Sequence, residues 1–168
     1  MSAYADVLRW LQPLGLLREE TPDSLRGKIE EGDGEEEFLE RLEGDRARTL
    51  SSIVAAFDPN ALLNPAERAR AVAAWSPPLW KHLGLKGRYD ASAGRARVED
   101  GSRVLADEPV THGCHAALAW TKALAERGFE ALILNVGSDD ESFLAVTRES
   151  AERIRRDGLL ALSRPCPR

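Results

Sequence analysis

The chain has 168 residues, of which 43% are hydrophobic and 30% charged, and its formal net charge at pH 7 is −5. A chain of this length buries roughly 70% of its unfolded surface, so its fold needs neither a structural metal nor a disulfide framework. The composition is that of a globular protein, which excludes long disordered segments. We therefore expect a single domain over residues 1–168.

Charge is distributed unevenly along the chain. Residues 1–46 contain 13 acidic and 6 basic residues, a net charge of −7, whereas residues 47–168 carry a net charge of +2. Without a broad basic face, binding to nucleic acid is disfavoured. The acidic part can attract a basic protein, or it can be a solvated face that only aids solubility.

The cysteines and the N-terminus bear on the compartment. Cys114 and Cys166 could form one disulfide, but two free thiols in a cytoplasmic protein are the commoner case. The first segment, MSAYADVLRWLQPLGLL, is too polar for a signal peptide, and no apolar run approaches the ~20 residues that cross a bilayer. We expect a cytoplasmic protein with no membrane partner.

Helical periodicity dominates the first half of the chain. Tyr4, Leu8 and Leu11 recur at helical spacing and predict a first helix. The expected helices cover residues 2–12, a segment that Thr21 caps, residues 35–43, residues 46–57, and a segment from an Asn64 cap to about Trp75. Residues 1–46 belong to the domain or form an acidic helical attachment to it.

The last third alternates between helices and strands. Asp100-Gly101 has the two-residue hairpin signature, although a surface loop is the alternative because the flanking alternation is weak. Beyond it we expect a helix from Thr111 to Arg127, strands over 129–136 and 141–147, a helix over 148–157 and a strand over 159–163. Residues 129–136 are apolar on both faces and should lie in the middle of the sheet. The order predicts an α+β fold with an antiparallel or mixed sheet covered by helices.

A cluster of metal-binding residue types, His112-Gly113-Cys114-His115, opens the helix after Thr111. On a helix these side chains do not converge, and Cys114 shares the buried face with Ala117 and Leu118. Two histidines are too few for a closed zinc site. We expect no metal and no cofactor, with Cys114 as a buried free thiol.

A second candidate for chemistry is the turn Gly137-Ser138-Asp139-Asp140. Paired carboxylates divide acid and base roles only where their environments differ, and adjacent turn residues usually serve the turn itself. No Gly-x-Ser-x-Gly elbow or phosphate-binding loop is present. A small hydrolase would have to combine His112, His115, Asp139 and Asp140.

The acidic run over residues 30–45 holds nine acids and one base, Arg41. Burying unpaired carboxylates is too costly, so the run must face water or meet the cations of a partner. The residues that we expect to bind such a partner are Glu31, Asp33, Glu35, Glu36 and Glu37.

A resemblance adds to this interpretation. The strand Ala131–Val136, the turn 137–140, the strand Phe143–Val146 and the helix start at Arg148 carry it. With them, residues 117–162 resemble an uncharacterised family of small bacterial domains, some of which are similar to immunity proteins of contact-dependent toxin systems. The resemblance covers about a quarter of the chain and transfers no catalytic residue. The absence of a catalytic constellation and the acidic first part of the chain favour a non-enzymatic binding or regulatory protein, whose partner would be a basic protein such as a nuclease-like toxin.

Overall fold

The computed structural model describes residues 2–138, 141–164 and 166. The helices are α1 (Ala3–Leu11), α2 (Pro22–Gly32), α3 (Glu35–Gly44), α4 (Arg46–Phe57), α5 (Arg68–Ala73), α6 (Gly113–Leu124) and α7 (Arg148–Asp157). The strands are β1 (Ala61–Leu63), β2 (Leu85–Asp90), β3 (Arg95–Asp100), β4 (Arg103–Pro109), β5 (Phe129–Asn135) and β6 (Glu141–Thr147). The expected α+β class is confirmed.

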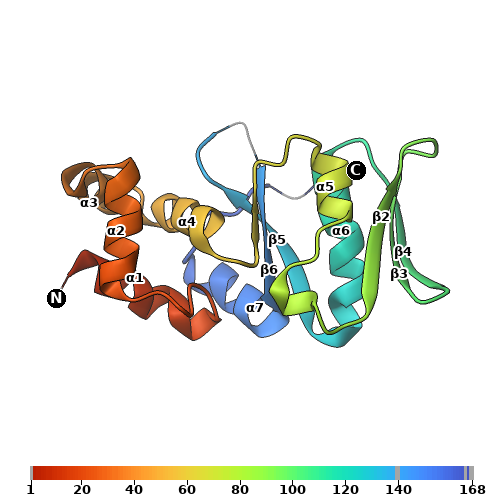
Figure 1. Cartoon of the computed structure of the whole chain (residues 1–168), viewed down its shortest axis with the longest axis horizontal. Helices are drawn as coiled ribbons and strands as arrows, with labels where there is room; N and C mark the ends of the chain where they lie inside the picture. The colour runs from red at the N-terminus through yellow and green to blue at the C-terminus, as the bar shows by residue number, and fades with distance from the viewer. Residues whose placement is uncertain (1, 139–140, 165, 167–168) are drawn as a thin grey trace.

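The strands form two antiparallel sheets, with orders β1-β6-β5 and β2-β3-β4. In Figure 1 the helices α1–α4 lie on one side of the β1-β6-β5 sheet, and α6 separates its other side from the β2-β3-β4 sheet. The middle strand is β6 and not β5. The expected strand over 159–163 is reduced to a bridge between Leu162 and Leu134, which follows the outer edge of β5.

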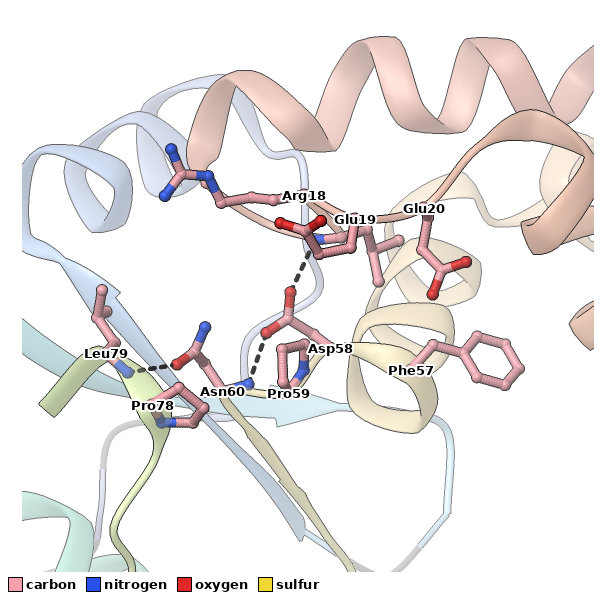
Figure 2. Close-up of a pocket in the computed structure, with 11 residues that line it drawn as sticks. Arg18, Glu19, Glu20, Phe57, Asp58, Pro59, Asn60, Pro78 and Leu79 are labelled. Carbon is pink, nitrogen blue, oxygen red and sulfur yellow. Dashed lines mark hydrogen bonds between the residues drawn. The ribbon is translucent and has the colours of Figure 1, made fainter. Parts of the chain in front are cut away.

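A buried carboxylate, that of Asp58, links two of the loops that connect these layers. Asp58, only 6% exposed, follows α4 and accepts hydrogen bonds from the backbone N–H of Leu17 at 2.7 Å and of Asn60 at 2.8 Å. The side-chain oxygen of Asn60 in turn accepts from the N–H of Leu79 at 2.8 Å, as Figure 2 shows. Because these bonds satisfy buried backbone donors, Asp58 holds the segment after α1 against the start of β1.

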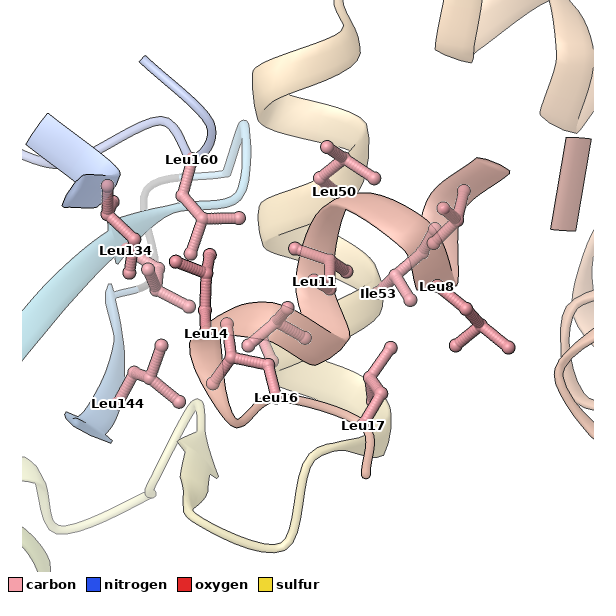
Figure 3. Close-up of a cluster of buried hydrophobic side chains, with 14 of the residues drawn as sticks. Leu8, Leu11, Leu14, Leu16, Leu17, Leu50, Ile53, Leu134, Leu144 and Leu160 are labelled. Carbon is pink, nitrogen blue, oxygen red and sulfur yellow. The ribbon is translucent and has the colours of Figure 1, made fainter. Parts of the chain in front are cut away.

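Each face of the β1-β6-β5 sheet is covered by its own hydrophobic core. Leu144 and Val146 point into the core made with α1–α4 and α7, part of which is drawn in Figure 3. Phe143 and Ala145, which alternate with them, point into the core made with α5, α6 and the β2-β3-β4 sheet. The alternation of side chains along a strand therefore feeds two cores from one strand.

The capping residues confirm several expected helix starts. The Thr21 side chain accepts from Ser24 N at the start of α2, and the Thr147 side chain accepts from Ser150 N at the start of α7. Asp45 does the same for α4 through Arg48 N. These bonds satisfy donors that the first helical turn leaves free.

In the middle of the chain, one expectation is wrong and two strands were not predicted. Asn64 does not cap a helix, because its φ of 41° is left-handed and the helix α5 begins only at Arg68. The strands β1 and β2 have no counterpart among the expected elements, since β1 has three residues and Gly87 interrupts the apolar pattern of β2. The Asp100-Gly101 hairpin, by contrast, is present as β3–β4, with Gly101 at φ 59°.

At Gly87, β2 lies close to α5 and α6. A Cβ atom there would overlap the carbonyl oxygen of Ala73 and lie 2.6 Å from Cζ2 of Trp120. The Trp120 ring is fixed in turn, because its Nε1 donates to the Val72 carbonyl at 2.8 Å and its face stacks on Trp80. The absence of a side chain at Gly87 is therefore a packing requirement.

We predict that Gly87→Ala lowers the free energy of unfolding by about 3 kcal/mol, because neither a backbone oxygen nor a fixed ring can move aside cheaply. Denaturant melts of the variant and the wild type measure this difference in the free energy of unfolding. The matched control is Gly27→Ala in α2, where a Cβ meets nothing within 4 Å and the chain should gain about 0.5–1 kcal/mol. Equal melting midpoints for Gly87→Ala and wild type would contradict the packing.

Candidate functional site

The acidic helices α2 and α3 lie together at one end of the molecule (Figure 1). Their apolar stripes are narrow, and Leu25, Ile29 and Phe38 alone of their side chains are fully buried in the first core. All other positions of the two helices are exposed or partly exposed. Each helix is thus fixed along one edge and presents the rest of its surface to solvent.

Contacts with α1 and α4 hold this end of the molecule in place. The ring of Tyr4 in α1 stacks on Phe38 in α3 with centroids 5.1 Å apart, and its hydroxyl donates to Glu30 Oε1 in α2 at 3.2 Å. Burial and the adjacent Glu30 carboxylate raise the pKa of Tyr4. Thr49 in α4 donates to the Arg41 carbonyl near the end of α3 at 2.9 Å. The acidic surface therefore has a fixed backbone.

Few of the carboxylates on this end are neutralised by a nearby base. Glu30 pairs with Arg26 at 2.9 Å, Asp33 pairs with Arg41, and Asp45 lies 3.5 Å from Arg48. Among the described residues, the other six acids of the run have no basic group within 4.0 Å: Glu31, Glu35, Glu36, Glu37, Glu40 and Glu43. Of the five expected partner-binding residues, Asp33 is the one that forms an ion pair with a described residue.

Part of this concentration of acidic residues has a local cause. Gly34 precedes α3, and because it has no side chain it cannot cap the first turn. Glu35, Glu36 and Glu37 occupy that turn. Carboxylates there interact favourably with the positive end of the helix dipole, by about 0.3–1 kcal/mol each at an exposed site. The dipole does not account for Glu31, Glu40 and Glu43, which lie away from a helix start.

On the outer face of the second sheet, formed by β2, β3 and β4, the charged side chains are instead paired with one another. Arg88 pairs with Glu99 at 2.7 Å, and Arg95 and Arg97 both pair with Asp107, at 2.6 and 3.0 Å. The hydrogen bond from Arg95, supported by Arg97, lowers the pKa of Asp107. These arginines thus pair with acids of the same sheet, whereas six of the acids on α2 and α3 have no basic group within 4.0 Å among the described residues.

Cys114 is buried as expected, at 2% exposure, but it is not a free thiol. It forms a disulfide with Cys166, with the two Cα atoms 5.7 Å apart. The expectation fails because the two cysteines are 52 residues apart and Cys166 lies in no periodic element. After the bridge at Leu162, the chain returns to the start of α6, which no local pattern indicates.

Of the four residues of the hydrolase alternative, the structure brings two together. The rings of His112 and His115 lie 5.6 Å apart, and Asp139 and Asp140 fall outside the described residues. Nδ1 of His115 accepts from the N–H of Thr111 at 3.0 Å and of His112 at 3.3 Å, so this buried histidine closes the first turn of α6. His112, not the expected Thr111, is the capping residue.

Among the hollows between described residues, two lie near groups with possible chemical roles. One of about 440 Å³ is bordered by Arg18, Glu19, Asp58 and Asn60 (Figure 2), where the Asp58 oxygens already accept from backbone amides. The other, of about 450 Å³, is bordered by His115 together with Glu108 and Lys122, which pair with each other. Asp58 in the first hollow, and Glu108 and Lys122 in the second, therefore already have structural partners.

Comparison with known proteins identifies no relative. No protein-family model, no curated protein and no solved structure matches the chain. Within the part of the chain that the structure describes, no helix has the length and apolar character that crossing a bilayer requires. The candidate functional surface is therefore defined by its geometry and charge: the acidic end formed by α2 and α3.

The disulfide gives a direct prediction for stability. A cross-link between residues 52 apart restricts the unfolded chain and stabilises the fold by about 2–4 kcal/mol. We expect Cys166→Ser to lose this amount in denaturant melts in the presence of a chelator. The reduced wild type should unfold at the same denaturant concentration as the variant. A variant as stable as the oxidised wild type would show that the cross-link contributes nothing.

Proposed function

We propose that this chain is a non-enzymatic protein-binding or regulatory protein, and that its acidic end docks a basic partner protein. The observation that carries the proposal is the set of six carboxylates on α2 and α3 without a basic group within 4.0 Å among the described residues. They are Glu31, Glu35, Glu36, Glu37, Glu40 and Glu43.

Physical chemistry favours this use of the surface. Carboxylates clustered on a fixed backbone produce a local negative potential that speeds the encounter with a positively charged surface. Leu39, which is 36% exposed among these acids, adds an apolar side chain that a partner can cover. A fixed surface also loses little conformational freedom on binding, which favours affinity.

The resemblance of residues 117–162 to an uncharacterised family of small bacterial domains, some of which are similar to immunity proteins, suggests the particular form of the proposal. An immunity-like protein neutralises a toxin by covering it, and a basic, nuclease-like toxin would complement the acidic end. We place this role in the cytoplasm, where thiol reductants would keep Cys114 and Cys166 in the dithiol form. Alkylation of thiols in freshly lysed cells, followed by mass spectrometry, tests the compartment through the redox state of this pair.

The hydrolase alternative has less support. It requires His115 as a reactive group, but Nδ1 of His115 accepts two backbone hydrogen bonds and the side chain is 8% exposed. A base that is committed to closing a helix turn is not free to take a proton from a substrate. The binding function needs no such group.

The test is a change of charge without a change of shape. We predict that combining Glu35→Gln, Glu36→Gln and Glu37→Gln slows association with the basic protein that co-purifies with the tagged chain by about tenfold at low salt. Stopped-flow mixing at several salt concentrations measures the rate. The salt dependence of the on-rate should flatten in the variant, because three of the attracting charges are gone.

The matched control neutralises three exposed acids elsewhere, Glu126, Glu149 and Glu152, of which Glu149 also lies in the first turn of a helix. This control should leave the on-rate within twofold of wild type. Equal on-rates for both triple variants, or the recovery of no basic protein at low salt, would reject the docking function. Melts of both variants separate lost binding from lost helix stability.

A further inference from the structure

The two cysteines meet a histidine where they pair. Cys114 Sγ, Cys166 Sγ and a ring nitrogen of His115 all lie within 4.8 Å of one another. Two thiolates and an imidazole form a typical ligand set for zinc and other thiophilic cations. We propose that reduction of the Cys114–Cys166 disulfide converts this cluster into a binding site for a thiophilic divalent cation such as Zn²⁺, with these three side chains as ligands.

The proposal replaces the expectation that the chain has no metal site. That expectation considers the segment 112–115 alone, in which the side chains diverge along a helix. The fold supplies the missing ligand, because Cys166 returns to the start of α6 from 52 residues further along the chain. A site with ligands from both a helix and a distant segment leaves no spacing motif in the sequence.

The geometry needs little change to accept an ion. A tetrahedral zinc with sulfur ligands at ~2.3 Å places its sulfurs ~3.8 Å apart, so the two sulfurs have to separate only modestly once their bond is broken. Cys114 is held by the buried face of α6, whereas Cys166 follows the last described pairing with β5, through Ser163. The adjustment therefore falls on Cys166 and not on α6.

The start of α6 also suits bound thiolates. Cys114 is the second residue of this 12-residue helix, and the helix dipole favours negative charge near its first turn. The cluster offers three protein ligands, which leaves one position of a tetrahedral ion for water. Such a position is typical of ions that exchange ligands, in contrast to closed structural sites.

His115 is the weakest of the three ligands. Its Nδ1 accepts from the N–H of Thr111 and of His112, so the neutral ring carries its proton on Nε2. To bind a cation the ring must give up these hydrogen bonds, through Nδ1 itself or through the other tautomer. We therefore expect the sulfurs to contribute most of the affinity.

The chemistry of the conversion is balanced. A dithiol reductant delivers two electrons and two protons, the S–S bond breaks, each cysteine becomes a thiol, and the reductant becomes a disulfide. The cation then replaces the two thiol protons, which pass to the buffer. No other oxidant or reductant takes part in these two steps.

The experiment uses Co²⁺ as a probe on the full chain, because cobalt bound by thiolates absorbs light by charge transfer. The chain is reduced with a dithiol, freed of the reductant without air, and titrated with Co²⁺, followed by displacement with Zn²⁺. We expect one Co²⁺ per reduced chain with thiolate charge-transfer absorption, and none in the oxidised chain. Each titration is accompanied by circular dichroism, which reports whether the fold is intact.

Variants test the contribution of individual ligands and distinguish the metal site from the acidic surface of α2 and α3. Cys166→Ser, outside the helices, should weaken Co²⁺ binding by more than the roughly 10- to 100-fold that loss of an outer partner costs. His115→Asn should weaken it less. The triple Glu35→Gln, Glu36→Gln, Glu37→Gln variant should bind as wild type does. Reduced wild type that binds Co²⁺ no more tightly than Cys166→Ser, or without charge-transfer absorption, would overturn the proposal.

Discussion

The structure depends on burying both faces of one short sheet. The middle strand β6 has five consecutive buried residues, Ser142 to Val146, and each face of it needs separate cover. The helices α1–α4 and α7 cover one face, while α5, α6 and the second sheet cover the other. Removing either layer would expose apolar surface, so the two cores are stable only together.

This arrangement explains why the two ends of the molecule differ chemically. The β1-β6-β5 sheet supplies the inner side of both cores, so the outermost elements need only narrow apolar edges. Phe38, with the partly buried Leu42, packs α3 against the core along one edge, and Gly87 lets β2 approach α6 closely. The remaining surface of these elements carries charge. Among the described residues, six acids of α2 and α3 have no basic group within 4.0 Å, whereas Arg88, Arg95 and Arg97 of the second sheet pair with acids of the same sheet.

Local patterns predict the parts of this fold in which one element determines its own limits. The spacing of Leu50, Ile53 and Val54 predicts α4, and a capping threonine with a following glycine predicts α7 between Thr147 and Gly158. The acidic end follows from composition alone, since such charge cannot be buried. Features that arise from distant segments leave no such pattern: the short strand β1, the junction at Asp58 and the meeting of Cys114 with Cys166.

Native-state hydrogen exchange on the oxidised chain tests the dependence on β6 most directly. If both cores rest on this strand, its backbone amides can exchange only when the whole chain unfolds. Their protection should then equal the free energy of unfolding from denaturant melts and exceed the protection of α2, α3 and β2. Amides of β6 that exchange through a local opening, with less protection than those of the outer layers, would contradict the account.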